Sequence, residues 1–397
     1  MADEGVAYRL RPLAERILGT SAPLRIRAWD GSEIGPSGAP AVVIRDRRAL
    51  RRLLWKPGET GLARAYLAGE IDVDGDLVAV LGRLFAIARR GGDGALRLTT
   101  RQQSEIVRTA VKLGAVGPEP APPEDEELLG VLRYGPAGDG GLAEHLRMPT
   151  AFYEQLLGTP MTYSAAHWTG GVDDLAAAQK AAFEEIGREL ALEPGMRVLD
   201  LGCGWGALAV HLAEAYAAHA VGVTPVPEHA TYARDRAAAA GVAGRTDFRE
   251  GDVDAVVDVA RAAAPYDAVV SISGAAEHAD GAVFARAAGD LLRPGGVLLV
   301  ARLAGARAGG PIPSLGTVIS GLEAADVEVR DVHDMRADYV RTIRAWIANL
   351  TGDGASAPTG PVRARLLVLA GTAVGLDAGR LGAYRITATR RANAAFG

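Results

Sequence analysis

The sequence predicts an α/β protein in which a mostly parallel sheet, with an antiparallel edge and helices on both faces, follows a small α+β domain. Two observations lead to this prediction. In the second half of the chain, short apolar β-like runs alternate with helical patterns, as in proteins whose parallel strands are linked by helices. The composition also changes abruptly at Val116–Glu127 (VGPEPAPPEDEE), where prolines and acidic residues cluster without an apolar period.

Residues 1–117 are predicted to form the small α+β domain, and residues 118–127 a solvated linker. Leu24–Trp29 alternates apolar and charged residues like a strand, and Ala41–Ile44 is a second apolar run. Arginines cluster just after it. They form either a patch for phosphate or an anionic membrane, or a solvated helix face, which is the commoner case; they are Arg45, Arg47, Arg48, Arg51 and Arg52.

Residues 128–397 are predicted to form the second domain. An amphipathic helix, Asp173–Leu192, begins at a cap on Asp173 or Asp174 and stops before Pro194-Gly195. The predicted sheet strands and helices then alternate in the order strand Arg197–Leu201, helix Leu208–Ala217, strand Ala220–Thr224, helix Glu228–Ala239, strand Asp267–Ile272, helix Ala282–Leu292, strand Gly296–Leu303 and helix Ser314–Ala325. The β-rich segments Val327–Val332 and Tyr384–Thr389 predict the antiparallel edge.

Composition excludes several classes of protein. A hydrophobic content of 49% and a mean hydropathy of +0.09 over 397 residues predict globular domains rather than disorder. The formal charge of −5 disfavours a nucleic-acid partner. The apolar run Leu366–Leu376 is far shorter than the roughly 18 to 20 residues that span a bilayer, so no integral membrane association is expected.

The cysteine and histidine content restricts the chemistry further. One cysteine, Cys203, permits neither an internal disulfide nor a cysteine-based zinc cluster, and the seven histidines show no ligand spacing, so no metal is expected. The first residues, MADEGVAYRL, lack the basic flank and apolar core of a secretory signal, so a cytoplasmic location is expected. A homo-oligomer stays open.

The most informative motif is Val198–Gly206 (VLDLGCGWG), an apolar strand that runs into a glycine-rich turn and then a helix. Glycines at positions 202, 204 and 206 let the backbone approach a ligand closely, at the carboxyl end of a strand, where open α/β sheets bind ligands. The dinucleotide fingerprint is spaced G-x-G-x-x-G, whereas the spacing here is G-x-G-x-G. A structural glycine turn is the alternative reading.

This motif, with Asp200 before its glycines, resembles motif I of class I S-adenosylmethionine methyltransferases. Four further stretches narrow the resemblance to the cyclopropane-fatty-acid synthase and mycolic acid methyltransferase family: Ala65–Leu77 (AYLAGEIDVDGDL), Phe152–Trp168 (FYEQLLGTPMTYSAAHW), Ser273–Asp280 (SGAAEHAD) and Pro311–Leu350. The resemblance implies a Rossmann-like, seven-stranded sheet. It also implies that residues 1–117 are the accessory N-terminal domain of the longer bacterial synthases.

The same resemblance implies S-adenosylmethionine as the cofactor and names the residues that would line it. Thr224 ends the second strand where most methyltransferases have an acid, and His229 stands where the family usually has a glutamine. His229 is either a cofactor ligand or a solvated helix residue. The expected cofactor-binding residues are Tyr163, Ser164, Asp200, Gly202, Gly204, Gly206, Thr224, His229 and Asp252.

At the reaction centre, the family commonly binds bicarbonate as the base, between a cysteine, a glutamate, a histidine and a tyrosine. Glu277 and Tyr339 match two of these, whereas Ala165 and Ala301 occupy the cysteine and histidine positions. Half of the expected contacts are lost, which disfavours bicarbonate. Glu277 is then the first candidate for the base.

The other catalytic candidates each have a structural alternative. Tyr339 is otherwise a core tyrosine. His278 otherwise packs against a strand end, and His167 is otherwise a surface residue.

The predicted function is therefore S-adenosylmethionine-dependent C-methylation or cyclopropanation of an alkene or electron-rich carbon. Because the acceptor-side residues depart from the family, the acceptor is expected to be an unsaturated small molecule other than a phospholipid, in secondary metabolism. The first alternative is a cyclopropane synthase that acts on unsaturated acyl chains of phospholipids. A second is a cofactor-binding protein that has lost catalysis.

Overall fold

The structure, a computed structural model, describes residues 5–18, 24–56, 58–89, 100–127, 148–251, 265–272, 281–306, 312–352 and 357–392. The chain divides into two compact units. Unit 1 comprises residues 1–130 and 356–374, and unit 2 comprises residues 131–355 and 375–397. Residues 356–374 are predicted from the sequence to belong to the second domain, whereas in the structure they belong to unit 1.

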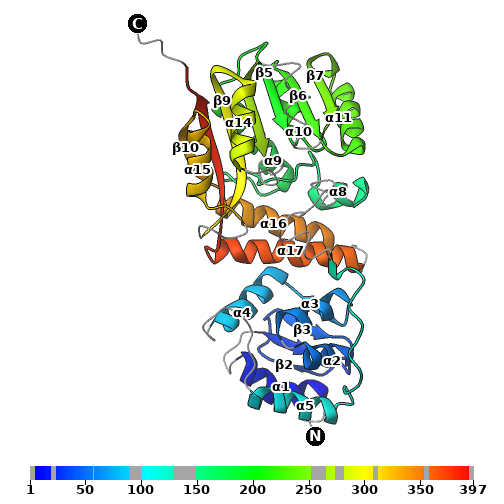
Figure 1. The fold of residues 1–397 in the computed structure, drawn as a ribbon. Coiled ribbons are helices and arrows are strands. Elements are labelled where there is room, and N and C mark those ends of the chain that lie inside the picture. Colours follow the sequence, from blue (N-terminus) through cyan, green and yellow to red (C-terminus); the bar gives the residue numbers. More distant parts are fainter. Residues whose placement is uncertain are drawn as a thin grey trace. The chain divides into compact units, whose positions relative to one another are not determined.

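Unit 1 contains a four-stranded sheet with strand order β2-β1-β3-β4 (Figure 1). Strand β1 is antiparallel to β2 and parallel to β3, and β3 is antiparallel to β4. Helices surround this sheet, and their apolar faces form its core. The elements are α1 (Val6–Leu18), β1 (Arg25–Arg27), β2 (Glu33–Ile34), β3 (Ala41–Ile44), α2 (Arg48–Trp55), α3 (Glu59–Leu67), β4 (Ile71–Asp74), α4 (Leu77–Arg89) and α5 (Thr100–Lys112).

Most of the arginines that follow β3 make contacts within unit 1. Arg52 is buried, pairs with Glu70 at 2.8 Å and donates to the carbonyl of Ala121 at 2.7 Å. Arg51 donates to the carbonyls of Ala115 and Val116, each at 3.2 Å. Through these contacts the start of the expected linker lies against unit 1.

Unit 2 is built on a seven-stranded sheet with strand order β10-β11-β9-β8-β5-β6-β7. Neighbouring strands from β9 to β7 are parallel, and β11 runs antiparallel to both β9 and β10. The strands are β5 (Arg197–Leu201), β6 (His219–Thr224), β7 (Thr246–Glu250), β8 (Tyr266–Ile272), β9 (Leu292–Gly305), β10 (Val327–Asp334) and β11 (Leu381–Arg390). The mostly parallel sheet with an antiparallel strand near its edge is thereby confirmed.

Helices cover both faces of this sheet, which explains why its strands are apolar on both sides. One face packs against α14 and α15, around Leu291, Leu298 and Leu322. Near β6 and β7 the other face packs against α10 and α11. The helices of this unit are α8 (Thr150–Leu157), α9 (Leu175–Glu189), α10 (Ala207–Ala215), α11 (Pro227–Ala239), the short 3-10 turn η1 (Ala243–Arg245), α14 (Gly281–Leu291), α15 (Leu315–Ala324) and α16 (Arg336–Thr351).

Helix α17 (Gly360–Asp377) runs from unit 1 into unit 2. Its residues up to Val374 belong to unit 1, where Arg363 donates to the carbonyls of Tyr66 and Ile71. None of the described helices is both long enough and apolar enough to cross a bilayer.

Candidate functional site

The candidate site lies at the carboxyl ends of β5 and β6, where the glycine turn leads into α10. The turn is held to β6 by backbone hydrogen bonds: the amides of Gly202 and Cys203 both donate to the carbonyl of Val223, at 2.9 and 3.0 Å. The three glycines have φ values of +87°, +52° and +74°, a region that other residues rarely adopt. This edge of the sheet is where ligands bind in doubly wound folds.

Three buried polar side chains at this edge have atoms without a hydrogen-bond partner among the described residues. They are both carboxyl oxygens of Asp200, the hydroxyl of Thr224 and Nδ1 of His229, and the three residues are no more than 2% exposed. Buried polar atoms without partners are rare, because each costs free energy. Their grouping at one edge indicates a site that receives a polar ligand.

Burial also shifts the acid–base behaviour of two of these residues. Removal from water raises the pKa of Asp200 to about 7. It lowers the pKa of His229 to about 4, so this imidazole is neutral at pH 7. The reading of His229 as a solvated helix residue is therefore wrong, since only 2% of it is exposed.

The glycines of the site are required for different reasons. A Cβ at Gly206 would lie 2.6 Å from the Cβ of Ala233 and 2.9 Å from the ring of Phe248. A Cβ at Gly204 would meet nothing within 4 Å. Gly206 is thus fixed by packing, whereas the backbone at Gly204 faces open space, where a ligand can approach it.

An aromatic cluster borders the polar edge. The rings of Trp205 and His229 lie 4.1 Å apart between centroids, and Tyr153 lies 4.8 Å from Trp205. Tyr163 stacks on Trp346 at 5.1 Å, and Tyr339 meets the same indole edge-on at 6.1 Å. Neither tryptophan was predicted as a site residue from the sequence, although Trp205 lies inside the glycine turn and Trp346 lies two helical turns after Tyr339.

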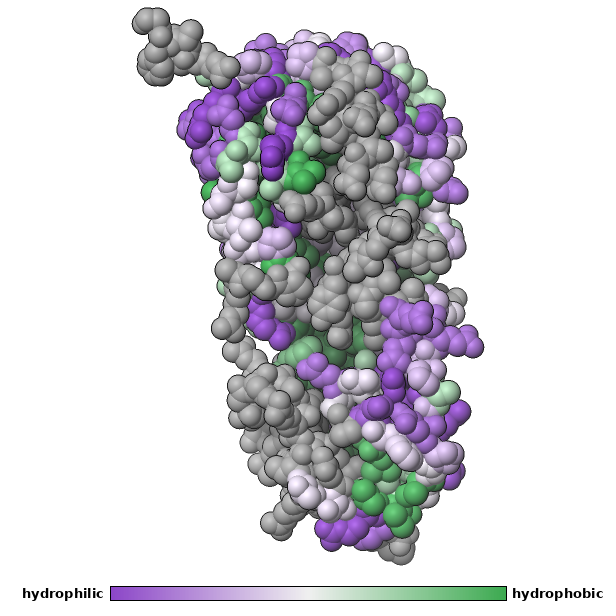
Figure 2. Space-filling model, in the orientation of Figure 1, coloured by the Kyte–Doolittle hydropathy of each residue, from purple (hydrophilic) through white to green (hydrophobic). Residues whose placement is uncertain are grey.

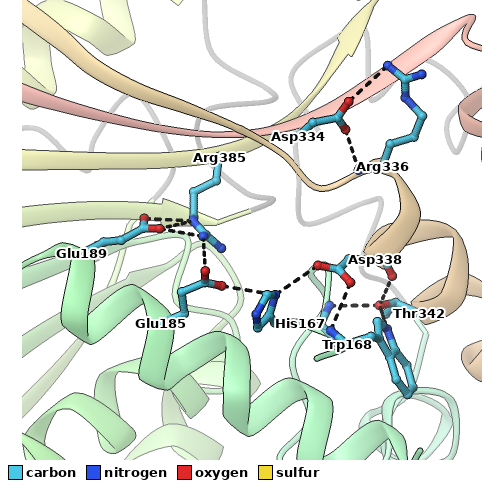
Figure 3. Close-up of polar contacts among 10 residues, drawn as sticks. His167, Trp168, Glu185, Glu189, Asp334, Arg336, Asp338, Thr342 and Arg385 are labelled. Carbon is cyan, nitrogen blue, oxygen red and sulfur yellow. Dashed lines mark hydrogen bonds and ion pairs between the residues drawn. The ribbon is translucent and has the colours of Figure 1, made fainter. Parts of the chain in front are cut away.

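The segment that carries Tyr163 and Ser164 is held by helix α16 (Figure 3). Thr342 accepts hydrogen bonds from the amide of Ala166 and the indole of Trp168, both at 3.0 Å. Asp338, one turn earlier, accepts from the amide of Trp168 at 3.1 Å. These two side chains form a clamp, which we call the α16 clamp, on residues 166–168.

His167 lies in a chain of polar contacts that extends from this clamp to β11 (Figure 3). Its Nδ1 lies 3.2 Å from Asp338 and 3.3 Å from Glu185 on α9. Arg385 on β11 then pairs with Glu185 at 2.9 Å and with Glu189 at 2.6 Å. His167 therefore contacts protein carboxylates from two helices rather than lying free on the surface.

The structure brings some of the expected catalytic residues together and not others. Tyr339 is 8% exposed and belongs to the aromatic cluster. Ala301 lies on β9 opposite Arg385 of β11, and its methyl group offers no polar contact. Glu277, His278 and the cofactor candidate Asp252 fall outside the described residues.

Comparisons with known proteins agree with this arrangement. The profile of the family described as mycolic acid cyclopropane synthetase matches residues 141–308. A probable fatty acid methyltransferase of Pseudomonas putida is 27% identical over 93% of this chain and 92% of its own length. The cyclopropane-fatty-acyl-phospholipid synthase of Escherichia coli K12 is 29% identical over 51% of this chain and 54% of that protein.

A solved structure shares the fold. The mycolic acid cyclopropane synthase CmaA1, crystallised with SAH and CTAB, superimposes with a TM-score of 0.55 at 24% identity, over 61% of this chain and 94% of that chain. The mostly parallel sheet, the glycine turn at its carboxyl edge and these matches lead to one conclusion. In fold and in sequence, the chain is similar to S-adenosylmethionine-dependent methyltransferases of the cyclopropane synthase type.

Proposed function

We propose that this protein transfers the methyl group of S-adenosylmethionine to a carbon of an unsaturated fatty acyl chain. The observation that carries the cofactor half of the proposal is the group of partnerless buried atoms on Asp200, Thr224 and His229. The acyl half is supported by a relative named as a fatty acid methyltransferase that matches this chain over nearly its whole length.

The residues of the site suit the cofactor. The open backbone at Gly204 and the amides at the start of α10 would hold its amino-acid end, because such amides favour a carboxylate. Thr224 and His229 would offer hydrogen bonds to its ribose hydroxyls and adenine. When bound, S-adenosylmethionine supplies an electrophilic methyl group on its sulfonium sulfur. Tyr163 and Ser164, which directly precede the residues that the α16 clamp holds, would close the site on the other side.

The aromatic cluster has a second role in this proposal. Addition of a methyl group to an alkene leaves a cationic carbon, and the faces of aromatic rings attract cations without reacting with them. Tyr163, Trp346 and Tyr339 provide such rings next to the clamp. Trp346 is completely buried, so its indole is shielded from bulk solvent.

A proton must then leave the methylated carbon. The residues that match the family's bicarbonate contacts do not suit that ion, because the alanines at 165 and 301 have no donors. We therefore assign the base to the chain itself. Glu277 remains the first candidate, with Tyr339, His278 and His167 as the others. His167 already lies between two carboxylates, which suits a positioning role better than proton removal.

A second candidate acceptor is an unsaturated small molecule that is not a phospholipid. The observation that favours it is the pair Ala165 and Ala301, which stand where the resembling family has a cysteine and a histidine. Transfer of methyl groups would then occur to such molecules in solution and not to acyl chains.

The deciding experiment incubates the purified protein with S-adenosylmethionine carrying a labelled methyl group. The acceptors are unsaturated phospholipid vesicles, free unsaturated fatty acids and a panel of polar alkenes. We expect label in the acyl chains, and gas chromatography with mass spectrometry then distinguishes a ring from a branch. Label only in the polar alkenes supports the second candidate. Cofactor binding by calorimetry without any transfer supports a protein that has lost catalysis.

A Glu277→Gln variant tests the assignment of the base. We expect it to bind the cofactor like the parent protein and to lose most of its turnover, because general-base catalysis contributes roughly 10²- to 10⁴-fold. Tyr339→Phe tests the next candidate base in the same way, since this variant keeps the ring and removes only the hydroxyl. Normal turnover of Glu277→Gln would remove Glu277 from the mechanism.

A further inference from the structure

Unit 1 carries most of the large hydrophobic side chains that the described part of the chain exposes. Trp55, Val107, Val111 and Val116 are 51%, 49%, 61% and 54% exposed, and in the described part only Val283, in unit 2, joins them. Val107 and Val111 lie one turn apart on α5, so both point to the same side of this helix. Exposed apolar side chains that gather in one place mark an interaction surface more often than scattered ones do.

These four side chains lie in the same region of unit 1, because α2 packs against α5. Trp55 ends α2, and its indole donates to the carbonyl of Gly117 at 3.0 Å, which places it beside Val116. Arg51, one turn earlier on α2, binds the carbonyl of Val116. We call Trp55, Val107, Val111 and Val116 the apolar patch. Figure 2 shows apolar side chains next to hydrophilic ones on the face of unit 1 that it draws.

Basic residues interleave with the apolar patch. Arg108 and Lys112 follow Val107 and Val111 directly on α5, and Lys56 follows Trp55. Arg47 reaches the end of α5, where its guanidinium lies 3.6 Å from the Cβ position of Gly114. All four are exposed, and no described carboxylate forms an ion pair with any of them.

The other arginines of this region are used differently. Arg45, Arg48 and Arg52 pair with acidic residues of unit 1, at 2.9, 3.4 and 2.8 Å respectively. Three of the five arginines in the cluster noted in the sequence are thus paired with carboxylates of unit 1. The charge available to a partner comes from Arg47, Lys56, Arg108 and Lys112, which we call the basic rim.

We propose that the apolar patch and its basic rim dock unit 1 on the surface of an anionic lipid bilayer. A tryptophan that is half exposed, with valines beside it, can insert to the depth of the head groups. Lysine and arginine around them are attracted to anionic head groups. This inference goes beyond the proposed reaction and does not depend on it, because docking needs neither cofactor nor turnover.

A second copy of the chain is the less suitable occupant. In a symmetric dimer the same patch faces itself, so the basic rims of the two copies would meet. Like charges that face each other oppose association. An anionic bilayer instead supplies the opposite charge over the whole patch.

The test measures sedimentation of the full chain, without cofactor, with vesicles of phosphatidylcholine and phosphatidylglycerol or of phosphatidylcholine alone. We expect binding to the anionic vesicles only, with a partition coefficient that falls as salt is added. Val111→Glu should lower this coefficient at least about tenfold. Replacing Lys56 and Lys112 together by glutamine should lower it about thirtyfold, because each basic residue contributes roughly fivefold near a charged surface.

Two variants serve as controls. Val283→Glu changes the exposed valine of unit 2 and should leave vesicle binding unchanged. Trp55→Phe should bind like the parent protein but lose the blue shift of tryptophan fluorescence on binding. Equal binding to neutral vesicles, or unchanged binding of Val111→Glu, overturns the proposal. The proposal is also overturned if the parent protein does not bind vesicles but forms a concentration-dependent dimer in analytical ultracentrifugation that Val111→Glu abolishes.

Discussion

At the scale of single residues, Asp200 has the environment that differs most from water. Burial raises its pKa from 3.8 to about 7, so the folded state retains a proton that the unfolded chain releases near pH 4. The resulting contribution to stability is complete below about pH 4 and is lost as the pH rises to 7. It amounts to about 4 kcal/mol at most, since one pKa unit corresponds to about 1.4 kcal/mol.

The substitution Asp200→Asn should therefore stabilise the cofactor-free protein, relative to the parent, more at pH 8 than at pH 5. We expect the difference in free energy of unfolding between variant and parent to rise by about 2 to 4 kcal/mol over that interval, because asparagine has no charge to bury. Urea unfolding at the two pH values measures it. A difference that does not change with pH would mean that Asp200 is ionised in the folded protein. The variant should also bind S-adenosylhomocysteine more weakly.

His229 gives the opposite pH dependence. Burial lowers its pKa from 6.5 to about 4, so its contribution to stability is present above pH 6.5 and is lost as the pH falls through 4. Between pH 7 and pH 4 the parent protein should lose about 2 to 3 kcal/mol of unfolding free energy through His229, and the His229→Gln variant should lack this loss. Because the resembling family has glutamine here, cofactor affinity should stay within a few-fold of the parent value. Calorimetry at pH 7 checks the affinity, and a large loss would show that the imidazole itself is needed.

At the scale of elements, two glycines of the turn are needed for different reasons: Gly206 for packing and Gly204 for ligand binding. Gly206→Ala brings a methyl group within 2.6 Å of Ala233 and should cost about 2 to 4 kcal/mol of stability. Gly204→Ala meets no atom and should cost only about 1 kcal/mol, for its left-handed backbone. Its cofactor affinity should nevertheless fall more than tenfold, because the methyl group enters the open space. Equal losses of stability in the two variants would contradict this distinction.

The α16 clamp is an element that positions residues of the site. Thr342→Val keeps the shape of the side chain but leaves the amide of Ala166 and the indole of Trp168 without their acceptor. Each lost partner costs about 1 to 3 kcal/mol. The KM for S-adenosylmethionine should rise about tenfold or more, since Tyr163 and Ser164 lie on the same segment. Thr342→Ser should restore both stability and KM. A change in kcat alone would instead assign Thr342 to the chemical step.

The sequence predicts these elements well where local signals and tertiary packing agree. The helix expected from Asp173 begins at Leu175, with Asp174 as its cap through a 2.9 Å hydrogen bond to the amide of Ala177. Strand β5 has the predicted bounds, since its apolar run ends at the first glycine of the turn. The burial of His229 was not predictable, because it depends on Trp205, which reaches it from another element.

At the scale of the whole molecule, the units are not continuous in sequence. The helical sequence between the two β-rich segments, with its apolar run Leu366–Leu376, carries no signal for which core it completes. Its partners lie some 290 residues earlier, where Arg363 binds the carbonyl of Ile71 and pairs with Asp72 at 3.1 Å. A change of composition such as that at Val116–Glu127 therefore indicates where the chain leaves unit 1, but not where it returns to it.

This topology predicts that a substitution late in the chain destabilises the early unit. Arg363→Met removes a buried guanidinium and leaves Asp72 and two carbonyls of unit 1 without it, which should cost about 3 kcal/mol or more. Scanning calorimetry with S-adenosylhomocysteine identifies the transition of unit 2 as the one that the ligand raises. The variant should lower the other transition and leave the ligand-sensitive one, and ligand affinity, unchanged. Arg330→Met, which removes an exposed ion pair of unit 2 with Glu328, is the matched control and should change neither transition by more than about 1 kcal/mol. If both transitions fall together in Arg363→Met, the segment 356–374 stabilises the two units jointly.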